Sequence, residues 1–406
     1  MSLSSFPPLQ DKNAISLWSW FHSSSNPVLL IDGGVSTHLE NIIAPKRFTH
    51  RHLWSSSLLL TEEGKASIIK GHRDWLNSGC DILTTVTYQC HYGLFRGVTS
   101  TETPSAVDHD DSVMEVLPED KIEAMMVDGV NLAKQAIDIN NPQILSSSSA
   151  SSPILRPFVV ASTGPYGSAM ADGSEYTGNY PAHVTRQALV NFHTRKAQTL
   201  LMEGKPDGLA VETIPNIEEV GVVCEVLRDL QLQREEMEPD SPSIACWISL
   251  ACRNGSEMND GHTVEEALQI VQLYDPTGRW IAGVGINCFH SAYISPLVNI
   301  LIKASLLQNG GRRGIIIYPN SGEGWDAVNE NWNDGSGTSD DELVDRLMVA
   351  VQLIRDQCEV ESGTKEESAS NLLKHRCMPK IILGGCCRTS PATIAMLRKK
   401  IDENDK

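Results

Sequence analysis

The sequence lacks any hydrophobic run long enough to cross a bilayer, and it lacks the features of a secretory signal. No stretch of about 18 apolar residues occurs in the 406-residue chain, whereas a membrane-spanning helix needs about 20. The first 25 residues are rich in Ser and contain Pro7 and Pro8, with no basic start followed by an apolar run. We therefore expect a cytoplasmic protein without a membrane partner, in which residues 1–25 form an N-terminal extension.

Positive charge is scarce as well. The chain has 33 Lys and Arg against 51 Asp and Glu, which gives a formal net charge of −18. A field of this sign repels nucleic-acid phosphates and anionic lipids and also favours solubility. Nucleic acid is therefore not expected as a partner.

The ten cysteines include no CxxC pair. In so long a chain they do not form a disulfide scaffold, and thiols in the cytoplasm stay reduced. Structural zinc normally takes four ligands from paired motifs of the CxxC kind, so a structural zinc knuckle is not expected. Most of the cysteines are expected to be small buried residues, and the others are available for metal binding or nucleophilic chemistry.

What the sequence does contain is a repeated alternation of short apolar, β-branched runs with longer helical patterns. The eight runs cover residues 28–32, 82–87, 158–162, 208–212, 244–250, 282–287, 314–319 and 380–384. Helical periodicity predicts helices over residues 62–78, 186–204, 217–231, 264–274, 292–308 and 340–356. This alternation is typical of parallel strands joined by crossover helices. The predicted fold is an α/β protein with a (β/α)8 TIM-type barrel, and an open doubly wound sheet is the alternative.

Three polar segments are longer than barrel connections need to be. They cover residues 97–119, 140–152 and 359–370 and are rich in charged residues or serine. Because they interrupt the alternation without replacing it, we interpret them as surface loop insertions. The sequence thus predicts one barrel domain over residues 26–400.

Sulfur-containing side chains follow two of the predicted strands. Cys288 follows the sixth run, and the adjacent pair Cys386 and Cys387 follows the eighth after two glycines. In a parallel barrel, residues just past the carboxyl ends of the strands converge at one mouth. Three thiolates suit a cation such as zinc and leave its fourth tetrahedral position open, as in catalytic sites. Residue types alone equally allow core or loop thiols without a metal.

Carboxylates are predicted at the same mouth, because Asp32 ends the first run and Glu212 the fourth. A buried carboxylate needs a cation, which could be the ammonium group of an amino-acid substrate or a basic side chain of the protein. The glycines after Asp32 could offer N–H groups to a substrate carboxylate or could simply form a turn. The predicted substrate-binding residues are Asp32, Gly33, Gly34, Thr87, Glu212 and Asn287.

Seven segments of the sequence resemble homocysteine S-methyltransferases of the branch that uses S-methylmethionine or S-adenosylmethionine. These segments are LLIDGGVSTHLE from Leu29, TTVTYQC from Thr84, ASTGPYGSAMADGSEYTGNY from Ala161, ETIPNIEE from Glu212, GVGINC from Gly283, YPNSGEGWD from Tyr318 and ILGGCCRTSP from Ile382. They occur in the family's order over nearly the whole chain. Two features depart from the family pattern: the insertions look longer, and Cys90 stands where a small residue is usual.

The resemblance implies a (β/α)8 barrel in which Cys288, Cys386 and Cys387 bind Zn²⁺ and in which Asp32 and Glu212 belong to the amino-acid pocket. It also implies transfer of a methyl group from a sulfonium donor to the zinc-activated thiol of homocysteine, giving methionine without a protein acid or base. A sulfonium could lie against an aromatic face. The candidates for this contact are Tyr88, Tyr166, Trp247 and Trp325.

Other functions remain as alternatives. Betaine-using relatives have similar zinc motifs, although the segment 164–180 looks less like theirs. A zinc hydrolase usually has an HxH motif directly after the first strand, and a corrinoid-dependent methyltransferase needs a DxHxxG-type motif; neither occurs here. A non-enzymatic zinc or thiol protein would bind metal without homocysteine-dependent turnover. No feature of the sequence predicts an oligomeric state.

Overall fold

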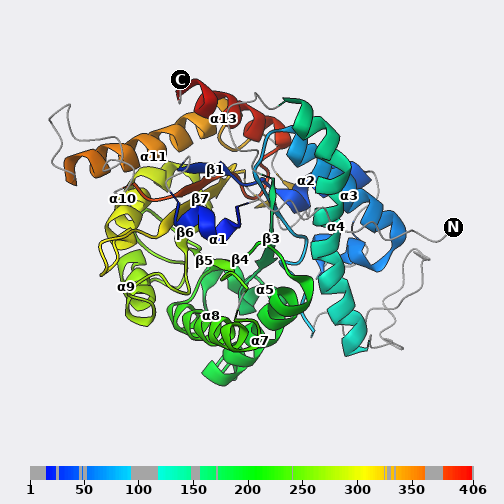
Figure 1. Cartoon of the computed structure of the whole chain (residues 1–406), viewed down its shortest axis with the longest axis horizontal. Coiled ribbons are helices and arrows are strands. Elements are labelled where there is room, and N and C mark those ends of the chain that lie inside the picture. The colour runs from blue at the N-terminus through cyan, green and yellow to red at the C-terminus, as the bar shows by residue number, and fades with distance from the viewer. Residues whose placement is uncertain are drawn as a thin grey trace.

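The computed structural model describes residues 15–23, 27–44, 48, 53–92, 118–147, 156–170, 172–239, 241–323, 325–326, 331–332, 335–361 and 378–404. Eight strands form one sheet at the centre of the molecule, and helices surround it (Figure 1). A separate antiparallel ribbon pairs β8 (Trp325–Asp326) with β9 (Asn331–Trp332). Within these residues, no helix is both long enough and apolar enough to cross a membrane.

All eight predicted strands are present, and they pair in parallel in the order β1-β10-β7-β6-β5-β4-β3-β2. They are β1 (Val28–Leu30), β2 (Ile82–Thr84), β3 (Phe158–Thr163), β4 (Gly208–Ile214), β5 (Ala245–Leu250), β6 (Gly283–His290), β7 (Gly314–Asn320) and β10 (Ile381–Leu383).

The sheet closes between β1 and β2. Ile31 and Ile82 form a parallel bridge, the Asp32 N–H donates to the Ile82 carbonyl at 3.1 Å, and the Asp81 N–H donates to the Leu30 carbonyl at 2.7 Å. This closure confirms the (β/α)8 barrel and rules out the open doubly wound sheet.

The six predicted helices are also present. The larger helices around the barrel are α2 (Val35–Ile43), α3 (Glu62–Asn77), α4 (Glu119–Ser147), α7 (Arg186–Gln198), α8 (Ile217–Met237), α9 (Val264–Tyr274), α10 (Ile294–Ser305), α11 (Asp340–Glu361) and α13 (Pro391–Asn404). Side-chain caps start several of them: Thr61 caps α3, Asn216 caps α8, and Thr263 forms a capping box with Glu266 at α9. Helix α7 continues as a π-helical segment, Thr199–Gly204.

Apolar side chains pack on both faces of the barrel wall. One core fills the space between the sheet and the outer helices, and a smaller core fills the barrel interior. Adjacent residues of a strand point to opposite faces and therefore belong to different cores. Ile316 belongs to the interior core, whereas Ile315 and Ile317 face the helices.

Helix α1 (Leu17–Phe21) closes the amino-terminal end of the barrel. Its Leu17 and Trp20 are fully buried in the interior core. Glycines at the starts of two strands leave room for it, since a Cβ on Gly314 would lie 2.3 Å from the Phe21 ring and one on Gly208 would lie 3.0 Å from Leu17. Part of the predicted extension, residues 17–21, is therefore packed into the barrel.

The three predicted insertions fall largely outside the described residues. Residues 140–147 differ from the prediction, because they continue helix α4 instead of forming a loop. Residue 119 begins the same helix, and residues 359–361 end helix α11. Residues 97–117, 148–152 and 362–370 are not among those described.

Candidate metal centre and substrate pocket

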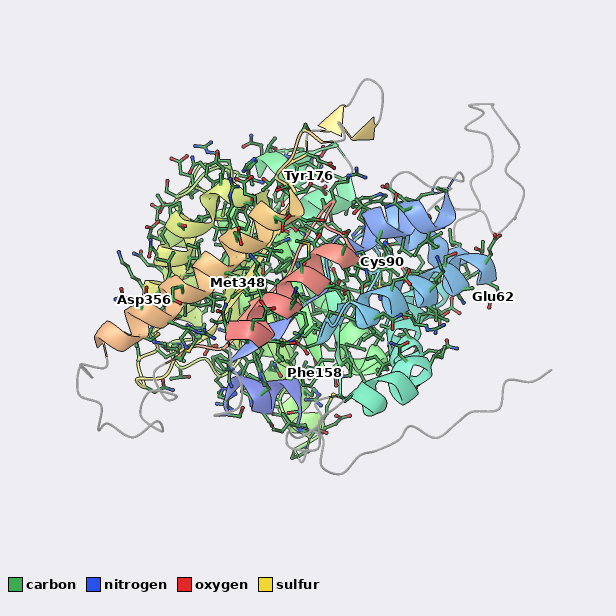
Figure 2. All side chains as sticks on the ribbon, turned by 90° about the horizontal axis from the view of Figure 1, so that it is seen from above. Glu62, Cys90, Phe158, Tyr176, Met348 and Asp356 are labelled. Atoms are coloured by element: carbon green, nitrogen blue, oxygen red, sulfur yellow. The ribbon has the colours of Figure 1, made fainter. Side chains whose placement is uncertain are left out.

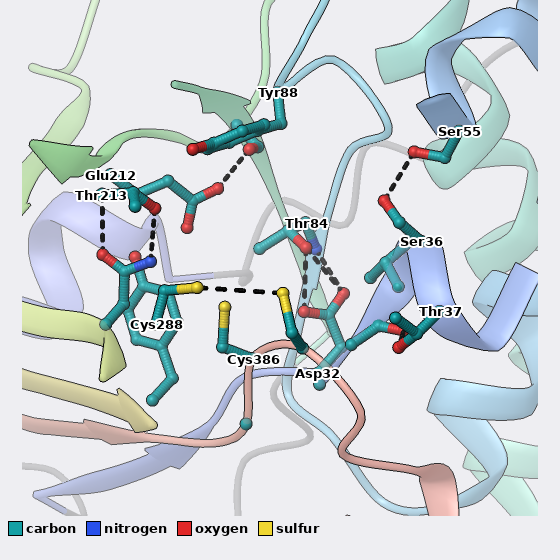
Figure 3. A pocket seen from close by; sticks show the side chains of 18 of the residues that line it. Asp32, Ser36, Thr37, Ser55, Thr84, Tyr88, Glu212, Thr213, Cys288 and Cys386 are labelled. Atoms are coloured by element: carbon teal, nitrogen blue, oxygen red, sulfur yellow. Dashed lines mark hydrogen bonds between the residues drawn. The ribbon is translucent and has the colours of Figure 1, made fainter. Parts of the chain in front are cut away.

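A cavity opens at the carboxyl ends of the barrel strands, where sequence analysis placed the chemistry (Figure 3). Eight of the nine predicted metal- and substrate-binding residues line it: Asp32, Gly33, Gly34, Glu212, Asn287, Cys288, Cys386 and Cys387. The ninth, Thr87, does not. The strand ends of β1, β4, β6 and β10 thus bring predicted residues from four distant parts of the chain to one cavity.

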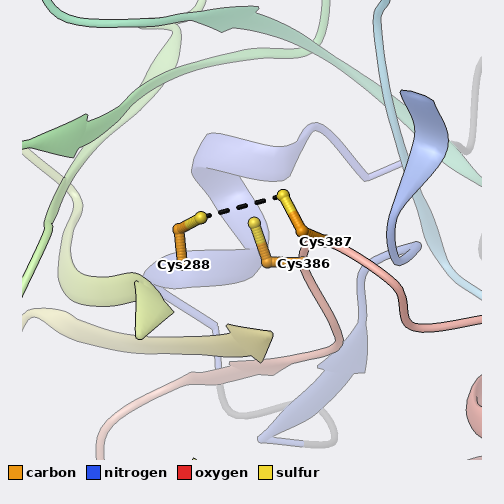
Figure 4. Close-up of side chains that lie close together, drawn as sticks. All are labelled: Cys288, Cys386 and Cys387. Atoms are coloured by element: carbon orange, nitrogen blue, oxygen red, sulfur yellow. Dashed lines mark hydrogen bonds between the residues drawn. The ribbon is translucent and has the colours of Figure 1, made fainter. Parts of the chain in front are cut away.

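The three cysteines converge at one side of this cavity (Figure 4). Their sulfur atoms all lie within 4.8 Å of one another, and the Sγ atoms of Cys288 and Cys387 are 3.8 Å apart. The remaining cysteines whose structure is described are all buried elsewhere, whereas these three are half-buried. The cluster thus combines mutual proximity with access from the cavity.

A β-bulge directs Cys288 into the cavity. The pairing of β6 with β7 shifts register between Asn287 and His290, and Cys288 has a φ of +54°. Adjacent residues of a regular strand face opposite sides, and a bulge re-aims a side chain. Consequently both Asn287 and Cys288 line the same cavity.

The two glycines before Cys386 fix the turn that presents the cysteine pair. A Cβ on Gly385 would lie 2.0 Å from the Thr389 hydroxyl oxygen, and one on Gly384 would lie 2.4 Å from Ile31. The Cys386 N–H donates to the Pro319 carbonyl at 2.8 Å, and the Thr389 hydroxyl donates to the Cys386 carbonyl at 2.7 Å. Backbone contacts therefore hold this turn against β7, with both cysteines lining the cavity.

Hydrogen bonds within the cluster change the pKa values of its thiols. Hydrogen bonding with the thiols of Cys288 and Cys386 lowers the pKa of Cys387 well below its usual value. Three sulfur donors, one of them readily ionised, match the preference of Zn²⁺ for thiolate ligands. The residues present therefore fit the metal that the sequence suggests.

Asp32 accepts hydrogen bonds from the chain itself. Its carboxylate receives the Thr84 N–H at 2.6 Å and the Thr84 hydroxyl at 2.9 Å. Burial raises the pKa of Asp32 well above its usual value; the bonds from Thr84 oppose this shift, and the nearby charge of Glu212 adds to it. Asp32 thus joins β1 to β2 and also presents its carboxyl group to the cavity.

Glu212 lies on the opposite wall and accepts a hydrogen bond from the Ser162 hydroxyl. Burial raises the pKa of Glu212 to about 7, the bond from Ser162 lowers it, and the charge of Lys196 also lowers it. Ser162 and Lys196 were not identified by sequence analysis, because neither follows a strand end as a charged or sulfur-containing residue.

Both polar atoms of the Asn287 side chain are hydrogen-bonded within the protein. Its Oδ1 accepts the Thr213 N–H and its Nδ2 donates to the Thr213 hydroxyl, both at 2.7 Å. Thr213 has a φ of +62°, a left-handed conformation that is costly for a β-branched residue. Asn287 therefore holds a strained turn next to Glu212, and it is a positioning residue for this wall of the cavity.

Gly34 and Thr87 take structural roles. The Gly34 N–H donates to the Thr389 hydroxyl at 3.0 Å. This N–H therefore serves the turn and is not offered to a substrate carboxylate. Thr87 is fully buried, and its hydroxyl donates to the Ser162 carbonyl at 2.7 Å. Its neighbours Thr84 and Thr85 line the cavity instead, because the chain turns immediately after β2.

Among the four aromatic candidates, Tyr88 lines the cavity (Figure 3). Its ring packs over Gly164, where a Cβ would lie 2.8 Å from it. Trp247 is fully buried in the barrel interior, and Tyr166 packs against Tyr180 and Phe192. The side chain of Trp325 lies outside the described part of the chain.

Comparison with known proteins identifies the family. The family model described as "Homocysteine S-methyltransferase" matches residues 29–401. The chain belongs to the homocysteine S-methyltransferase family. Members of this family are methyltransferases, and the cavity described above is therefore the candidate site of methyl transfer.

Several curated relatives cover nearly the full length of the chain. It is 29% identical to betaine-homocysteine S-methyltransferase of Drosophila melanogaster, with 95% of this chain and 96% of the relative covered. It is 30% identical to selenocysteine methyltransferase of Astragalus bisulcatus, with 91% of each covered. It is also 30% identical to homocysteine S-methyltransferase 1 of Arabidopsis thaliana, with 92% and 93% covered. The names of these relatives include two acceptors, homocysteine and selenocysteine, and one donor, betaine.

A solved structure has the same fold. The metallated form of the homocysteine methyltransferase MmuM from Escherichia coli superposes with a TM-score of 0.62 at 23% sequence identity, and the match covers 93% of this chain and 97% of that one. This chain and the Escherichia coli protein therefore share the barrel architecture.

Proposed function

We propose that this protein is a zinc-dependent homocysteine S-methyltransferase that uses S-methylmethionine or S-adenosylmethionine as methyl donor and forms methionine. The observation that carries the proposal is the convergence of three sulfur atoms within 4.8 Å of one another. They lie at a cavity that also contains two buried carboxyl groups, those of Asp32 and Glu212. This arrangement offers separate partners for a metal and for an amino acid.

Cys288, Cys386 and Cys387 are the residues that would hold the metal. Zinc bound there would lower the pKa of the homocysteine thiol, which is otherwise mostly protonated at neutral pH. Three protein ligands leave one tetrahedral position for that thiol. No protein base is needed, because the thiol proton leaves to solvent.

Asp32 and Glu212 are proposed to bind the ammonium group of homocysteine from two sides. The substrate carboxylate would lie toward the start of helix α2, whose first residues, Val35, Ser36 and Thr37, also line the cavity. A helix N-terminus favours an anion through its unpaired N–H groups and its dipole. This placement would orient the homocysteine side chain toward the cysteine cluster.

Methyl transfer is a single displacement. A lone pair of the homocysteine sulfur forms the new S–CH3 bond while the bond from this methyl group to the donor sulfur breaks and its electrons remain on that sulfur. The sulfonium donor becomes a neutral thioether. With S-methylmethionine, both products are methionine. The protein contributes by orienting the reactants and keeping the cavity enclosed.

Betaine is the alternative donor, and the similarity to the Drosophila melanogaster relative favours it. The resemblance of the segment 161–180 to the sulfonium-using branch favours the first proposal. Purified protein assayed with homocysteine and each of S-methylmethionine, S-adenosylmethionine and betaine separates the two. Turnover with betaine alone would contradict the sulfonium proposal.

The metal assignment is tested by Cys387→Ala and Cys288→Ala. We expect each variant to bind substoichiometric zinc and to lose methionine formation, with an unchanged far-UV circular dichroism spectrum. Cys252→Ala is the matched control, since Cys252 is a buried thiol that does not line the cavity. Full zinc content and normal turnover in the first two variants would overturn the metal assignment. Zinc binding by the wild type without any methionine formation would instead favour the non-enzymatic alternative.

A further inference from the structure

A third carboxyl group, that of Glu175, lines the cavity. Glu175 lies in the short helix α6 (Ser174–Thr177) and exposes only 9% of its surface. Its charge interacts with Cys387 of the cysteine cluster. Asp32 and Glu212 are already assigned to the ammonium group of the proposed acceptor, which leaves Glu175 available for a second cation.

Packing against two other loops fixes the position of helix α6. A Cβ on Gly167 would lie 2.6 Å from the Glu175 nitrogen, and one on Gly178 would lie 2.5 Å from the Pro215 carbonyl oxygen. The Asn216 side chain donates to the Gly178 carbonyl at 2.9 Å. Both glycines therefore allow the helix to lie directly against the loops after β3 and β4.

The Glu175 carboxyl group lacks a cationic partner among the described residues. The charged and polar groups that influence it are the Tyr176 hydroxyl, which is hydrogen-bonded to it, and the carboxylate of Asp172. Burial of a carboxylate without a cation is unfavourable and raises the pKa of Glu175. A positively charged ligand in the cavity would supply the missing partner.

Two aromatic side chains flank this carboxyl group. Tyr176 lines the cavity yet exposes 58% of its surface, which places it at the rim (Figure 2). Tyr88 lines the same cavity, and burial together with the charge of Glu175 raises the pKa of its hydroxyl. Aromatic faces attract cations, including onium groups that cannot donate a hydrogen bond.

We propose that Glu175, Tyr88 and Tyr176 form the subsite for the methyl donor and recognise its positively charged sulfonium centre. This inference rests on the proposed function. A subsite that binds cations matches the charge change of the reaction, because the donor enters as a cation and leaves as a neutral thioether. The spent donor therefore loses its electrostatic attraction to Glu175 at the moment of transfer, which favours its release.

The test compares Glu175→Gln with Glu218→Gln. Glu218 is an exposed residue in the first turn of helix α8 that does not line the cavity, so the control removes a surface carboxylate by the same substitution. We expect Glu175→Gln to raise KM and the calorimetric Kd for S-methylmethionine about tenfold, with KM for homocysteine, zinc content and Tm unchanged. Glu175→Asp, which retains the charge, should recover part of the affinity, and Glu218→Gln should match the wild type.

Methionine, the neutral thioether analogue of the donor, gives a second measurement. The wild type should bind S-methylmethionine more tightly than methionine, and Glu175→Gln should reduce this difference. Equal donor affinity in Glu175→Gln and wild type, or an equal rise in KM for both substrates, would overturn the subsite. Failure of the wild type to transfer a methyl group from any sulfonium would instead contradict the proposed function, because donor binding is measured independently.

Discussion

Burial sets the charge of the carboxyl group that we propose to face the substrate ammonium. The pKa of Glu212 is raised to about 7, chiefly by burial. Below this pH the group is protonated and loses its attraction for a cation. We therefore expect KM for homocysteine to rise about tenfold between pH 8 and pH 6, because the ionised fraction falls by that factor.

The variant Glu212→Gln separates this effect from titration of the substrate. It should have a high KM for homocysteine at every pH, and the additional rise toward pH 6 should be absent. Any pH dependence common to wild type and variant belongs to the substrate or the metal site. Parallel profiles for the two proteins would show that Glu212 does not titrate in substrate binding.

Lys196 couples this carboxyl group to Tyr88. Its ammonium is buried and donates to the Tyr88 carbonyl at 2.7 Å, and its charge lowers the pKa of Glu212. In Lys196→Met, we expect the rise in KM for homocysteine to begin at a higher pH, because the pKa of Glu212 increases. Lys134→Met is the control, since Lys134 donates to the carbonyls of Gly204 and Lys205 outside the cavity. A shift of the same size in both variants would exclude this coupling.

At the scale of elements, the bulges of β4 and β6 stabilise one another. Thr213 lies in the bulge of β4 and Asn287 begins that of β6, and two hydrogen bonds join their side chains and backbone. Asn287→Ala removes both bonds and leaves the left-handed backbone of Thr213 unsupported. We expect a loss of about 1–3 kcal/mol in the free energy of unfolding and weaker zinc binding, because Cys288 follows directly.

Urea denaturation and competition with a chromogenic zinc chelator measure these two effects. The exposed helical residue Asn191 provides a control in Asn191→Ala. A variant Asn287→Ala that loses stability but keeps wild-type zinc affinity would confine the bulge contact to a structural role.

Helix α1 contributes stability at the end of the barrel remote from the cavity. Trp20 is fully buried in the interior core, and the Lys380 ammonium lies 5.0 Å from the centroid of its ring. Trp20→Ala should lower the free energy of unfolding by about 3–5 kcal/mol, measured by urea denaturation, with zinc stoichiometry preserved. Trp18→Ala, on the same helix but only partly buried, should cost clearly less.

Sequence patterns were sufficient for the barrel because its strands and helices are locally encoded. Continuous apolar runs such as that of β7 are typical of strands covered on both faces, and turn residues mark their ends. The same pattern brought Cys288, Cys386, Glu212 and Asp32 to one mouth, since strand ends of a parallel barrel converge.

Features that depend on contacts between distant segments were not predictable in this way. The clamp of Asn287 on Thr213 joins residues 74 positions apart and sets both bulges. Glu175 belongs to a four-residue helix that is held by glycine contacts with other loops. Lys196, on the outer helix α7, donates to the carbonyl of the cavity residue Tyr88. Each of these requires tertiary packing, which local propensity does not contain.

At the scale of the whole molecule, stability and chemistry occupy different parts of the barrel. The two hydrophobic cores contain the strand residues, the inner faces of the helices and helix α1. The three cysteines of the cluster lie at the mouth, and only Cys386 packs against the edge of a core. The fold therefore has no need of a metal to bury its apolar surface, unlike small zinc-stabilised domains.

Removal of the metal should accordingly abolish activity and preserve the fold. We expect the protein treated with a chelator to retain its circular dichroism spectrum and a single cooperative unfolding transition, with a lower Tm because the metal stabilises only the folded state that binds it. Addition of ZnCl2 should restore methionine formation, and it should not do so in Cys387→Ala. Loss of helical signal on chelation would mean that the three-sulfur cluster supports the barrel itself. The cluster would then be a structural zinc site. Such sites are closed by four protein ligands and have no vacant position for a substrate.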